Sequence, residues 1–233
     1  MIPTSSTELS EVYSNATWAR GRAEQIVNDF HAFWYDTERY ASVTWWGHEC
    51  WKAPTDMIIY AELIHALRPT VIVEAGVYRG GSSLFFAHML ELLGQGQIIS
   101  IDIHDDKDIG PDPHGQLRPT HPRLRYVKGS SIDPTVVADV IDTITANPGP
   151  VFVILDSDHT MPHVLAELET YGPLATVIVV EDTDLGHEVL PHWGLGPREA
   201  VEKWLADEPN WYADRAMERL LLTCAPNGFL RRC

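Results

Sequence analysis

The stretch VIVEAGVYRGGS, residues 71–82, and its continuation QIISID, residues 97–102, decide the fold. The first stretch begins with a continuous apolar run, which is typical of a parallel strand buried on both faces. Gly76 ends this run, and the glycines after it permit positive φ angles and close backbone approach. Ser82 can cap a following helix. The sequence therefore predicts a strand, a glycine turn, a helix and a second strand that ends at Asp102.

This glycine turn suits a nucleoside-like ligand that carries no phosphate groups. A dinucleotide-binding turn needs a second glycine where this chain has Tyr78, so NAD is disfavoured. A phosphate-binding P-loop ends in Gly-Lys-Ser/Thr, whereas Gly80, Gly81 and Ser82 include no lysine, so ATP and GTP are disfavoured as well. The alternative is a turn that only packs a helix against the sheet.

The spacing Glu74-x-Gly76-x-x-x-Gly80-x-Ser82 resembles the first motif of class I S-adenosylmethionine methyltransferases. The resemblance implies that Glu74 and Gly76 lie under the methionine part of the cofactor. It also implies that Asp102, at the carboxyl end of the next strand, holds the ribose, and that the serines after the third strand contact the adenine. The residues expected to bind the cofactor are Glu74, Gly76, Tyr78, Gly80, Ser82, Asp102, Ser130, Ser131 and Asp156.

Composition excludes several classes of partner. The chain has 233 residues, 45% of them hydrophobic, and a formal net charge of −16. Such a charge disfavours nucleic acid and anionic membrane surfaces and favours a small-molecule substrate. Three scattered cysteines indicate neither a disulfide framework nor a zinc site and fit a reducing cytoplasm. No signal peptide or membrane-spanning apolar run is visible, so we expect a cytoplasmic protein.

Strands alternate with helices between residues 55 and 206, which predicts an α/β fold. We expect a doubly wound, mostly parallel seven-stranded sheet of the Rossmann-like type. Residues 1–43 are expected to form an N-terminal helical extension, and residues 44–233 the main domain. A helix at 23–37 would cover the sheet edge or contact another copy, so we expect a homo-oligomer. Strands are expected at residues 71–73, 97–102, 123–128, 151–155, 176–180, 220–223 and 229–231.

Two further segments are candidates for the walls of a ligand site. Residues 44–51 contain three tryptophans, and either they pack as a structural segment or Trp46 and His48 contact a substrate. Residues 104–122 show no periodicity and follow the strand that carries Asp102. A long loop in this place is either a lid over the cofactor or a mobile insertion with no role in chemistry.

Acidic side chains end two adjacent strands of the predicted sheet. Asp156 follows the fourth strand, and Glu181 and Asp182 follow the fifth. Because gathered carboxylates repel one another unless a cation compensates them, we expect these three to bind a hard divalent ion such as Mg²⁺. The alternative is that they are solvated residues that cap the next helices. His159 lies on the same rim and is the candidate general base.

A larger set of motifs resembles one family, over residues 44–233. These motifs are VEAGVYRGGSSLFFA, ISID, KGSS, VILDSDHT, VIVVEDT and LLTCAPNGFLRR. They are similar to the cephalosporin-hydroxylase-type family of class I methyltransferases, which includes sugar O-methyltransferases of antibiotic pathways. The resemblance implies S-adenosylmethionine, Mg²⁺ and O-methylation, with Asp156, Glu181 and Asp182 on the metal and His159 as the base. Asp158 is an extra acid in the same run and an alternative metal ligand or substrate contact.

The expected function is metal-assisted methyl transfer to a hydroxyl of a natural-product or sugar acceptor, with His159 taking the proton. Two rivals stay open at this point. An Fe(II) oxygenase would use two histidines and a carboxylate, but the common enzymes of that type are β-folds. A non-catalytic, methyltransferase-like subunit that binds a partner protein or a small molecule is the second, although it has no need of the acid–histidine set.

Overall fold

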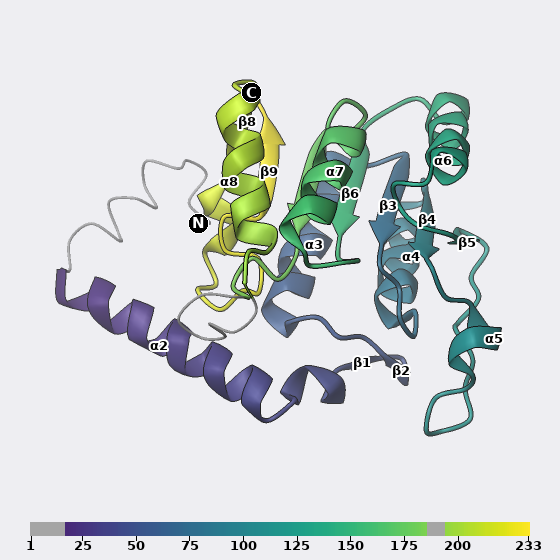
Figure 1. Cartoon of the computed structure of the whole chain (residues 1–233). Helices are drawn as coiled ribbons and strands as arrows, with labels where there is room; N and C mark the ends of the chain where they lie inside the picture. Colours follow the sequence, from purple (N-terminus) through teal and green to yellow (C-terminus); the bar gives the residue numbers. More distant parts are fainter. Residues whose placement is uncertain (1–16, 186–193) are drawn as a thin grey trace.

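A mixed sheet of seven strands runs through the molecule (Figure 1). The structure is a computed structural model that describes residues 17–185 and 194–233. The sheet has the order β5-β4-β3-β6-β7-β9-β8, in which β9 pairs antiparallel with both of its neighbours and the other pairs are parallel. The predicted seven-stranded, mostly parallel sheet is therefore confirmed. Its strands are β3 (Val71–Ala75), β4 (Gln97–Asp102), β5 (Leu124–Lys128), β6 (Val151–Leu155), β7 (Val177–Val180), β8 (Trp211–Ala213) and β9 (Phe229–Arg232).

Helices cover both faces of the sheet, as a doubly wound fold requires (Figure 1). One face packs against α3 (Pro54–Leu67) and α4 (Gly81–Leu93). The other packs against α6 (Pro134–Ala146), α7 (Met161–Tyr171) and α8 (Pro197–Asp207). Alternate residues of the central strands enter the two cores, because successive side chains of a strand point to opposite faces. The apolar runs that predicted these strands are therefore explained by burial on both sides.

The described part of the expected N-terminal extension contains a helix that lies beside the sheet rather than on it. Helix α2 (Thr17–Asp36) runs along one side of the molecule and leads through the 3₁₀ turn η1 (Arg39–Ser42) into a hairpin of β1 (Thr44–Trp45) and β2 (His48–Glu49) (Figure 1). On α2, the His31 ring donates from Nε2 to the carbonyl of Thr223 at 2.9 Å. The expected division of the chain at residue 43 stays a prediction.

The strand expected at residues 220–223 was wrong. The edge strand is β8 at Trp211–Ala213, and a second 3₁₀ turn, η2 (Arg215–Glu218), follows it. The backbone of 220–223 instead meets side chains at the start of α3, where Thr55 donates its hydroxyl to the carbonyl of Leu222 at 2.5 Å. The backbone of this segment therefore bonds to a helix, and Leu220 and Leu221 are exposed, although the apolar pattern is that of a strand.

Residues 104–122 are also more ordered than their composition indicated. They contain the short helix α5 (Asp106–Ile109), which Asp105 caps by accepting from the backbone of Lys107 and Asp108. The segment is neither structureless nor detached, since it contacts the glycine turn through several hydrogen bonds described below.

Gly76 occupies the tightest point of the fold, between the ends of β3 and β6. Its φ is +89°, and a Cβ there would lie 1.9 Å from the backbone oxygen of Asp156. Only glycine permits this approach. The cofactor-type turn and the strand end that carries Asp156 are therefore held against each other by the backbone itself.

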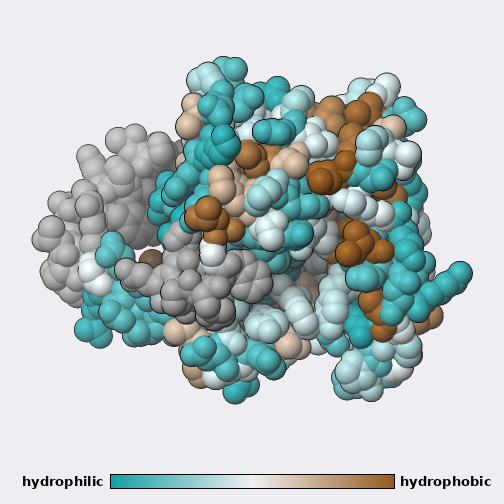
Figure 2. Space-filling model, viewed as in Figure 1, coloured by the Kyte–Doolittle hydropathy of each residue, from teal (hydrophilic) through white to brown (hydrophobic). Residues whose placement is uncertain are grey.

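The surface agrees with the acidic composition. The face shown in Figure 2 is mostly hydrophilic, with separate apolar patches. Within residues 17–185 and 194–233, no helix combines the length and the apolar character needed to cross a bilayer.

Asp56, in the first turn of α3, generates a stability prediction. It is 1% exposed and accepts from the backbone N–H of Cys224 at 2.9 Å. Its Oδ1 has no hydrogen-bond partner within residues 17–185 and 194–233. Burial raises the pKa of Asp56 to about 6, although hydrogen bonds from Thr223 and Cys224 lower it in part. The folded protein keeps this proton to about pH 6 while the unfolded chain loses it near pH 4, so this group makes stability fall as the pH rises between those values.

We expect Asp56→Asn to remove this dependence. The free energy of unfolding of the variant relative to wild type should increase by up to about 3 kcal/mol between pH 4 and pH 7. Urea denaturation across this pH range measures the difference, with Asp207→Asn at the exposed end of α8 as a surface-carboxylate control. A difference between Asp56→Asn and wild type that is constant with pH would contradict the prediction.

Candidate active site

A cavity of ≈ 830 Å³ opens at the carboxyl ends of the parallel strands. The turns after β3, β4 and β5 line one half of it, with Gly76, Tyr78, Asp102 and Ser131. The segments after β6 and β7 line the middle. The remaining wall comes from the N-terminal part of the chain and is mainly aromatic: Trp34, Tyr35, Tyr40 and Trp51. The cavity lies where ligands bind in open α/β sheets.

The glycine turn is held by a buried carboxylate beneath it. Glu74 is fully buried and accepts hydrogen bonds from the hydroxyls of Ser82 (2.5 Å), Ser83 (2.5 Å) and Ser100 (2.7 Å). Burial raises the pKa of Glu74, while Lys52 and the three hydroxyls lower it in part. Glu74 does not line the cavity, so its visible role is to fix the start of α4 under the turn.

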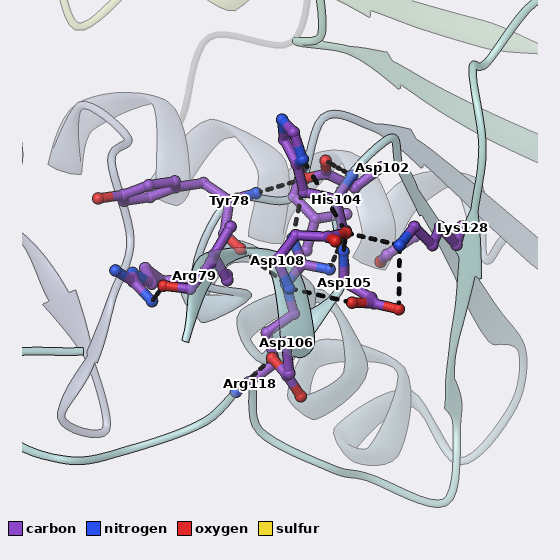
Figure 3. Close-up of polar contacts among 12 residues, drawn as sticks. Tyr78, Arg79, Asp102, His104, Asp105, Asp106, Asp108, Arg118 and Lys128 are labelled. Atoms are coloured by element: carbon purple, nitrogen blue, oxygen red, sulfur yellow. Dashed lines mark hydrogen bonds and ion pairs between the residues drawn. The ribbon is translucent and has the colours of Figure 1, made fainter. Parts of the chain in front are cut away.

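Asp102 joins the turn to the segment after β4 (Figure 3). Its Oδ2 accepts from the backbone N–H groups of Val77 (3.1 Å) and Tyr78 (2.9 Å) and from Arg118 (3.0 Å). Its Oδ1 accepts from the N–H of His104 (2.9 Å). Asp102 is thus at the cavity wall where the sequence predicted a ribose contact. Gly80 is the N-cap residue of α4 and does not line the cavity.

The serines after β5 form the far end of this half. Ser130 and Ser131 both line the cavity. The hydroxyl of Ser131 donates to Glu167 at 2.5 Å, and the backbone carbonyl of Ser131 accepts from the hydroxyl of Tyr171 at 2.6 Å. Helix α7 therefore fixes the loop that was expected to contact the adenine.

Asp156, His159 and Asp182 meet in the middle of the cavity. His159 Nε2 lies 3.2 Å from Asp156 Oδ1 and 3.3 Å from Asp182 Oδ2. One potential ligand atom of each residue lies within 4.8 Å of the others, a spacing that a single metal ion could bridge. Asp182 adopts a φ of +54°, a left-handed conformation that is rare for a residue with a side chain. The predicted rim of acids and one histidine is thus assembled in space.

Glu181 has a different environment from the other two acids. It is buried, and its Oε1 accepts from the hydroxyl of Tyr60 at 2.8 Å and from the ammonium group of Lys52 at 2.9 Å. Lys52 also donates to Asp156 Oδ2. One lysine therefore bridges two of the three carboxylates that were expected to bind metal.

Buried charges shift the pKa values in this cluster. Burial lowers the pKa of Lys52, but Asp156 and Glu181 outweigh this and hold it well above its usual value. Burial raises the pKa of Asp156, and Lys52 and His159 lower it to below its usual value. Burial raises the pKa of Glu181 to about 8, despite the opposing effect of Lys52. Burial lowers the pKa of His159, but Asp156 and Asp182 raise it to about 9.

The predicted substrate contacts are only partly at the cavity. Asp158 lines it, and its carboxylate accepts from the backbone N–H of Thr160 at 2.9 Å, ahead of α7. Trp46 and His48 do not line it. Trp46 is at the tip of the β1–β2 hairpin, 78% exposed, with its ring beside His88. The tryptophan that reaches the cavity from this segment is Trp51, which packs on the ring of Tyr78 with centroids 4.2 Å apart.

Sequence reasoning missed four residues that shape the site. Lys52 and Arg118 neutralise acids at the strand ends, and Trp34 and Tyr35 reach the cavity from α2. The hydroxyl of Tyr35 lies 3.2 Å from Asp182 Oδ1 and from Asp184 Oδ1. Of these four, only Lys52 could have been recognised from the sequence, because a lone basic residue within an aromatic, apolar stretch indicates a buried charge.

A known family matches most of this chain. The family model described as rhamnosyl O-methyltransferase/CmcI matches residues 37–233. The chain belongs to this family. Its relatives include the rhamnosyl O-methyltransferase of Mycobacterium tuberculosis strain H37Rv, 35% identical over 217 residues that cover 90% of this chain and 86% of the relative. That of Mycobacterium leprae is 37% identical over 216 residues, covering 90% and 91%.

Membership of the rhamnosyl O-methyltransferase/CmcI family identifies an enzyme, an S-adenosylmethionine-dependent O-methyltransferase. The resemblance recognised in the sequence is confirmed. Solved structures support the fold. CmcI described as a Mg–SAM form has a TM-score of 0.60 and 19% identity, covering 83% of this chain and 77% of that one. An apo structure of CmcI has a TM-score of 0.61 and 22% identity, covering 82% and 76%.

Lys52 generates a prediction for the carboxylate cluster. Its side chain is 3% exposed, and removing it leaves the buried Glu181 and the partly buried Asp156 without their lysine partner. Breaking a buried pair in this way costs about 3–5 kcal/mol. We expect Lys52→Met to lose stability of this size in EDTA and to regain part of it with Mg²⁺, because an added cation compensates the same carboxylates.

Urea denaturation in EDTA and in Mg²⁺ measures both effects. Lys128→Met is the matched control, since Lys128 also pairs with two acids, Asp105 and Asp108, but is 49% exposed. Its loss should be small and independent of Mg²⁺. Similar losses in the two variants would mean that Lys52 does not compensate the cluster.

Proposed function

We propose that this enzyme methylates a hydroxyl group of a sugar or of a sugar-bearing small molecule, with a divalent metal and with His159 as the general base. The observation that carries the proposal is the cavity that joins the glycine turn and Asp102 to the group of Asp156, His159 and Asp182. A methyl donor on one side and an activated hydroxyl on the other could meet there without leaving the cavity.

The cofactor half of the cavity suits S-adenosylmethionine. The Gly76 turn brings backbone close to the cavity, and Asp102 and Ser131 offer polar groups at the positions expected for the ribose and the adenine. When bound, the cofactor supplies an electrophilic methyl group. The chain itself would hold and orient it, because these groups are fixed by Glu74, Arg118 and Glu167.

The acids suit a hard divalent cation such as Mg²⁺. Asp156 and Asp182 offer carboxylate oxygens near one another, which is the donor chemistry that Mg²⁺ prefers. Glu181 lies beside them, with Oε1 shared by Lys52 and Tyr60. Loss of the protons held by Glu181 and His159 would leave three carboxylates facing the single ammonium group of Lys52, a net negative charge that a divalent cation would compensate. Bound there, the ion would lower the pKa of an acceptor hydroxyl.

His159 would take the proton from that hydroxyl, and its position in the cavity supports this role. It lines the cavity, and Asp156 and Asp182 orient its ring through Nε2. With its pKa raised to about 9 by these carboxylates, the ring is protonated at neutral pH. A cation shared by Asp156 and Asp182 would remove the charge that causes this shift. The base and the metal site would therefore act together.

The acceptor half of the cavity suits a ring with both apolar and hydroxylated faces. Aromatic side chains from α2, η1 and the segment after β2 form its wall, and Asp182, His159 and the hydroxyl of Tyr35 add polar groups. Ligand pockets commonly combine an aromatic lining with a few convergent polar groups. Relatives named rhamnosyl O-methyltransferase favour a sugar over a flat diol. A role in natural-product or antibiotic biosynthesis, a cytoplasmic location and a homo-oligomer stay predictions.

The test uses labelled S-adenosylmethionine with methyl α-L-rhamnoside or catechol as the acceptor, in Mg²⁺ or EDTA. We expect label on the rhamnoside, and only with Mg²⁺. Labelling of catechol alone would contradict a sugar acceptor, and full activity in EDTA would contradict the metal.

The role of His159 is tested by His159→Ala. We expect turnover to fall at least about a hundredfold, because general base catalysis contributes about 10²–10⁴-fold, while calorimetric affinity for S-adenosylhomocysteine changes little. His65→Ala, on the exposed end of α3, is the matched control. Parallel losses of turnover and of S-adenosylhomocysteine affinity in His159→Ala would assign a structural role instead.

A further inference from the structure

Arg118 is a buried arginine that belongs to the ordered segment after β4. Its side chain is 4% exposed. Three of its N–H donors reach separate acceptors around the glycine turn: Nε to the carbonyl of Tyr78 (2.7 Å), Nη1 to the carbonyl of His104 (2.8 Å) and Nη2 to Asp102 Oδ2 (3.0 Å). Its guanidinium also lies over the ring of Tyr126. Figure 3 draws Arg118 together with Tyr78, Asp102 and His104, and its dashed lines mark the polar contacts among the residues drawn.

The segment that carries Arg118 is fastened at further points. The backbone N–H of Arg118 donates to Asp106 Oδ1 at 3.2 Å. Lys128, at the end of β5, pairs with Asp105 (3.2 Å) and Asp108 (2.6 Å) (Figure 3). From the opposite side, Arg79 of the glycine turn donates to the carbonyl of Gly110 at 2.6 Å. Two arginines thus cross between turn and segment in opposite directions.

These contacts decide how the two oxygens of Asp102 are used. Oδ2 accepts from Val77, Tyr78 and Arg118. Among the residues that the structure describes, Oδ1 accepts only from the N–H of His104, which leaves a further lone pair for another donor. A carboxylate oxygen that is held in place and has one free lone pair is a preorganised acceptor for a hydroxyl group.

We infer that Arg118 is a positioning residue for the cofactor ribose. By occupying Oδ2 and bridging to Tyr78 and His104, it orients Asp102 so that Oδ1 can accept from a ribose hydroxyl. The segment 104–119, of which His104 lines the cavity, is then a fixed support behind the cofactor site rather than a lid. This inference rests on the proposed role of Asp102 in the cofactor half of the cavity.

The test is a thermodynamic cycle in which Arg118 and the ribose hydroxyls are removed separately and together. Calorimetry on the whole protein measures each ligand affinity. S-adenosylhomocysteine is compared with its 2′,3′-dideoxy analogue in wild type and in Arg118→Met. We expect wild type to bind S-adenosylhomocysteine at least about tenfold more tightly than the analogue, because hydrogen bonds to charged groups are the stronger ones. Arg118→Met should lose about tenfold on S-adenosylhomocysteine and less than about twofold on the analogue.

Two further variants keep the result clear. Arg118→Lys retains the charge but not the forked geometry, and its affinity for S-adenosylhomocysteine should lie between those of wild type and Arg118→Met. Arg125→Met removes an arginine of β5 that pairs with Asp139 at the surface, and both ligands should bind it as they bind wild type.

The outcomes separate the possible failures. Equal losses of both ligands in Arg118→Met, or no loss of either, would show that Arg118 does not act through the ribose and would overturn the inference. If wild type bound both ligands equally tightly, Asp102 would make no contact with the ribose hydroxyls. The inference about Arg118 would then be overturned, while the methyltransferase function would stand. No binding of S-adenosylhomocysteine by wild type would overturn the inference and the proposed function together.

Discussion

The contact between Gly76 and the backbone of Asp156 is the constraint on which the site depends. Because a Cβ at Gly76 would lie 1.9 Å from the Asp156 oxygen, β3 and β6 can end side by side only with glycine at this position. The cofactor turn follows one of these strand ends and the acid–histidine group follows the other. Their proximity is therefore a property of the backbone, and the side chains of both groups are positioned relative to this contact.

Charge compensation is the second constraint, since the strand ends gather carboxylates in a partly closed cavity. An unpaired buried carboxylate costs several kcal/mol in effective desolvation, so each must be ionised with a partner or protonated. Asp156 follows the first course, because Lys52 and His159 lower its pKa. Glu181 is protonated at neutral pH, because its pKa is raised to about 8. Neighbouring acids of similar sequence context thus have different properties because of what packs against them.

Sequence reasoning predicted what depends on local pattern and missed what depends on distant side chains. The central strands and the glycine turn were predicted because apolar runs and glycine spacing are local features. The acids were placed together because parallel strands end at one edge of a sheet. Lys52, Tyr35 and Arg118 could not be placed, because the docking of their segments is set by tertiary contacts. Lys52 and Tyr35 line the cavity, and Arg118 bonds to Asp102 in its wall. The error at 220–223 has the same origin, because this segment bonds to α3 instead of a strand.

The two cations of the site share one feature. Among the residues that the structure describes, Lys52 and Arg118 are the only lysine and arginine that are buried. Each compensates an acid at a strand end, Asp156 with Glu181 in one case and Asp102 in the other, and each comes from a segment outside the alternating strands and helices. The chain has a net charge of −16, and burying these two basic residues makes its surface more negative still. In the interior, their charges hold the carboxylates at the cavity in place. The irregular segments at 43–53 and 104–119 are thus as much part of the site as the sheet that they adjoin.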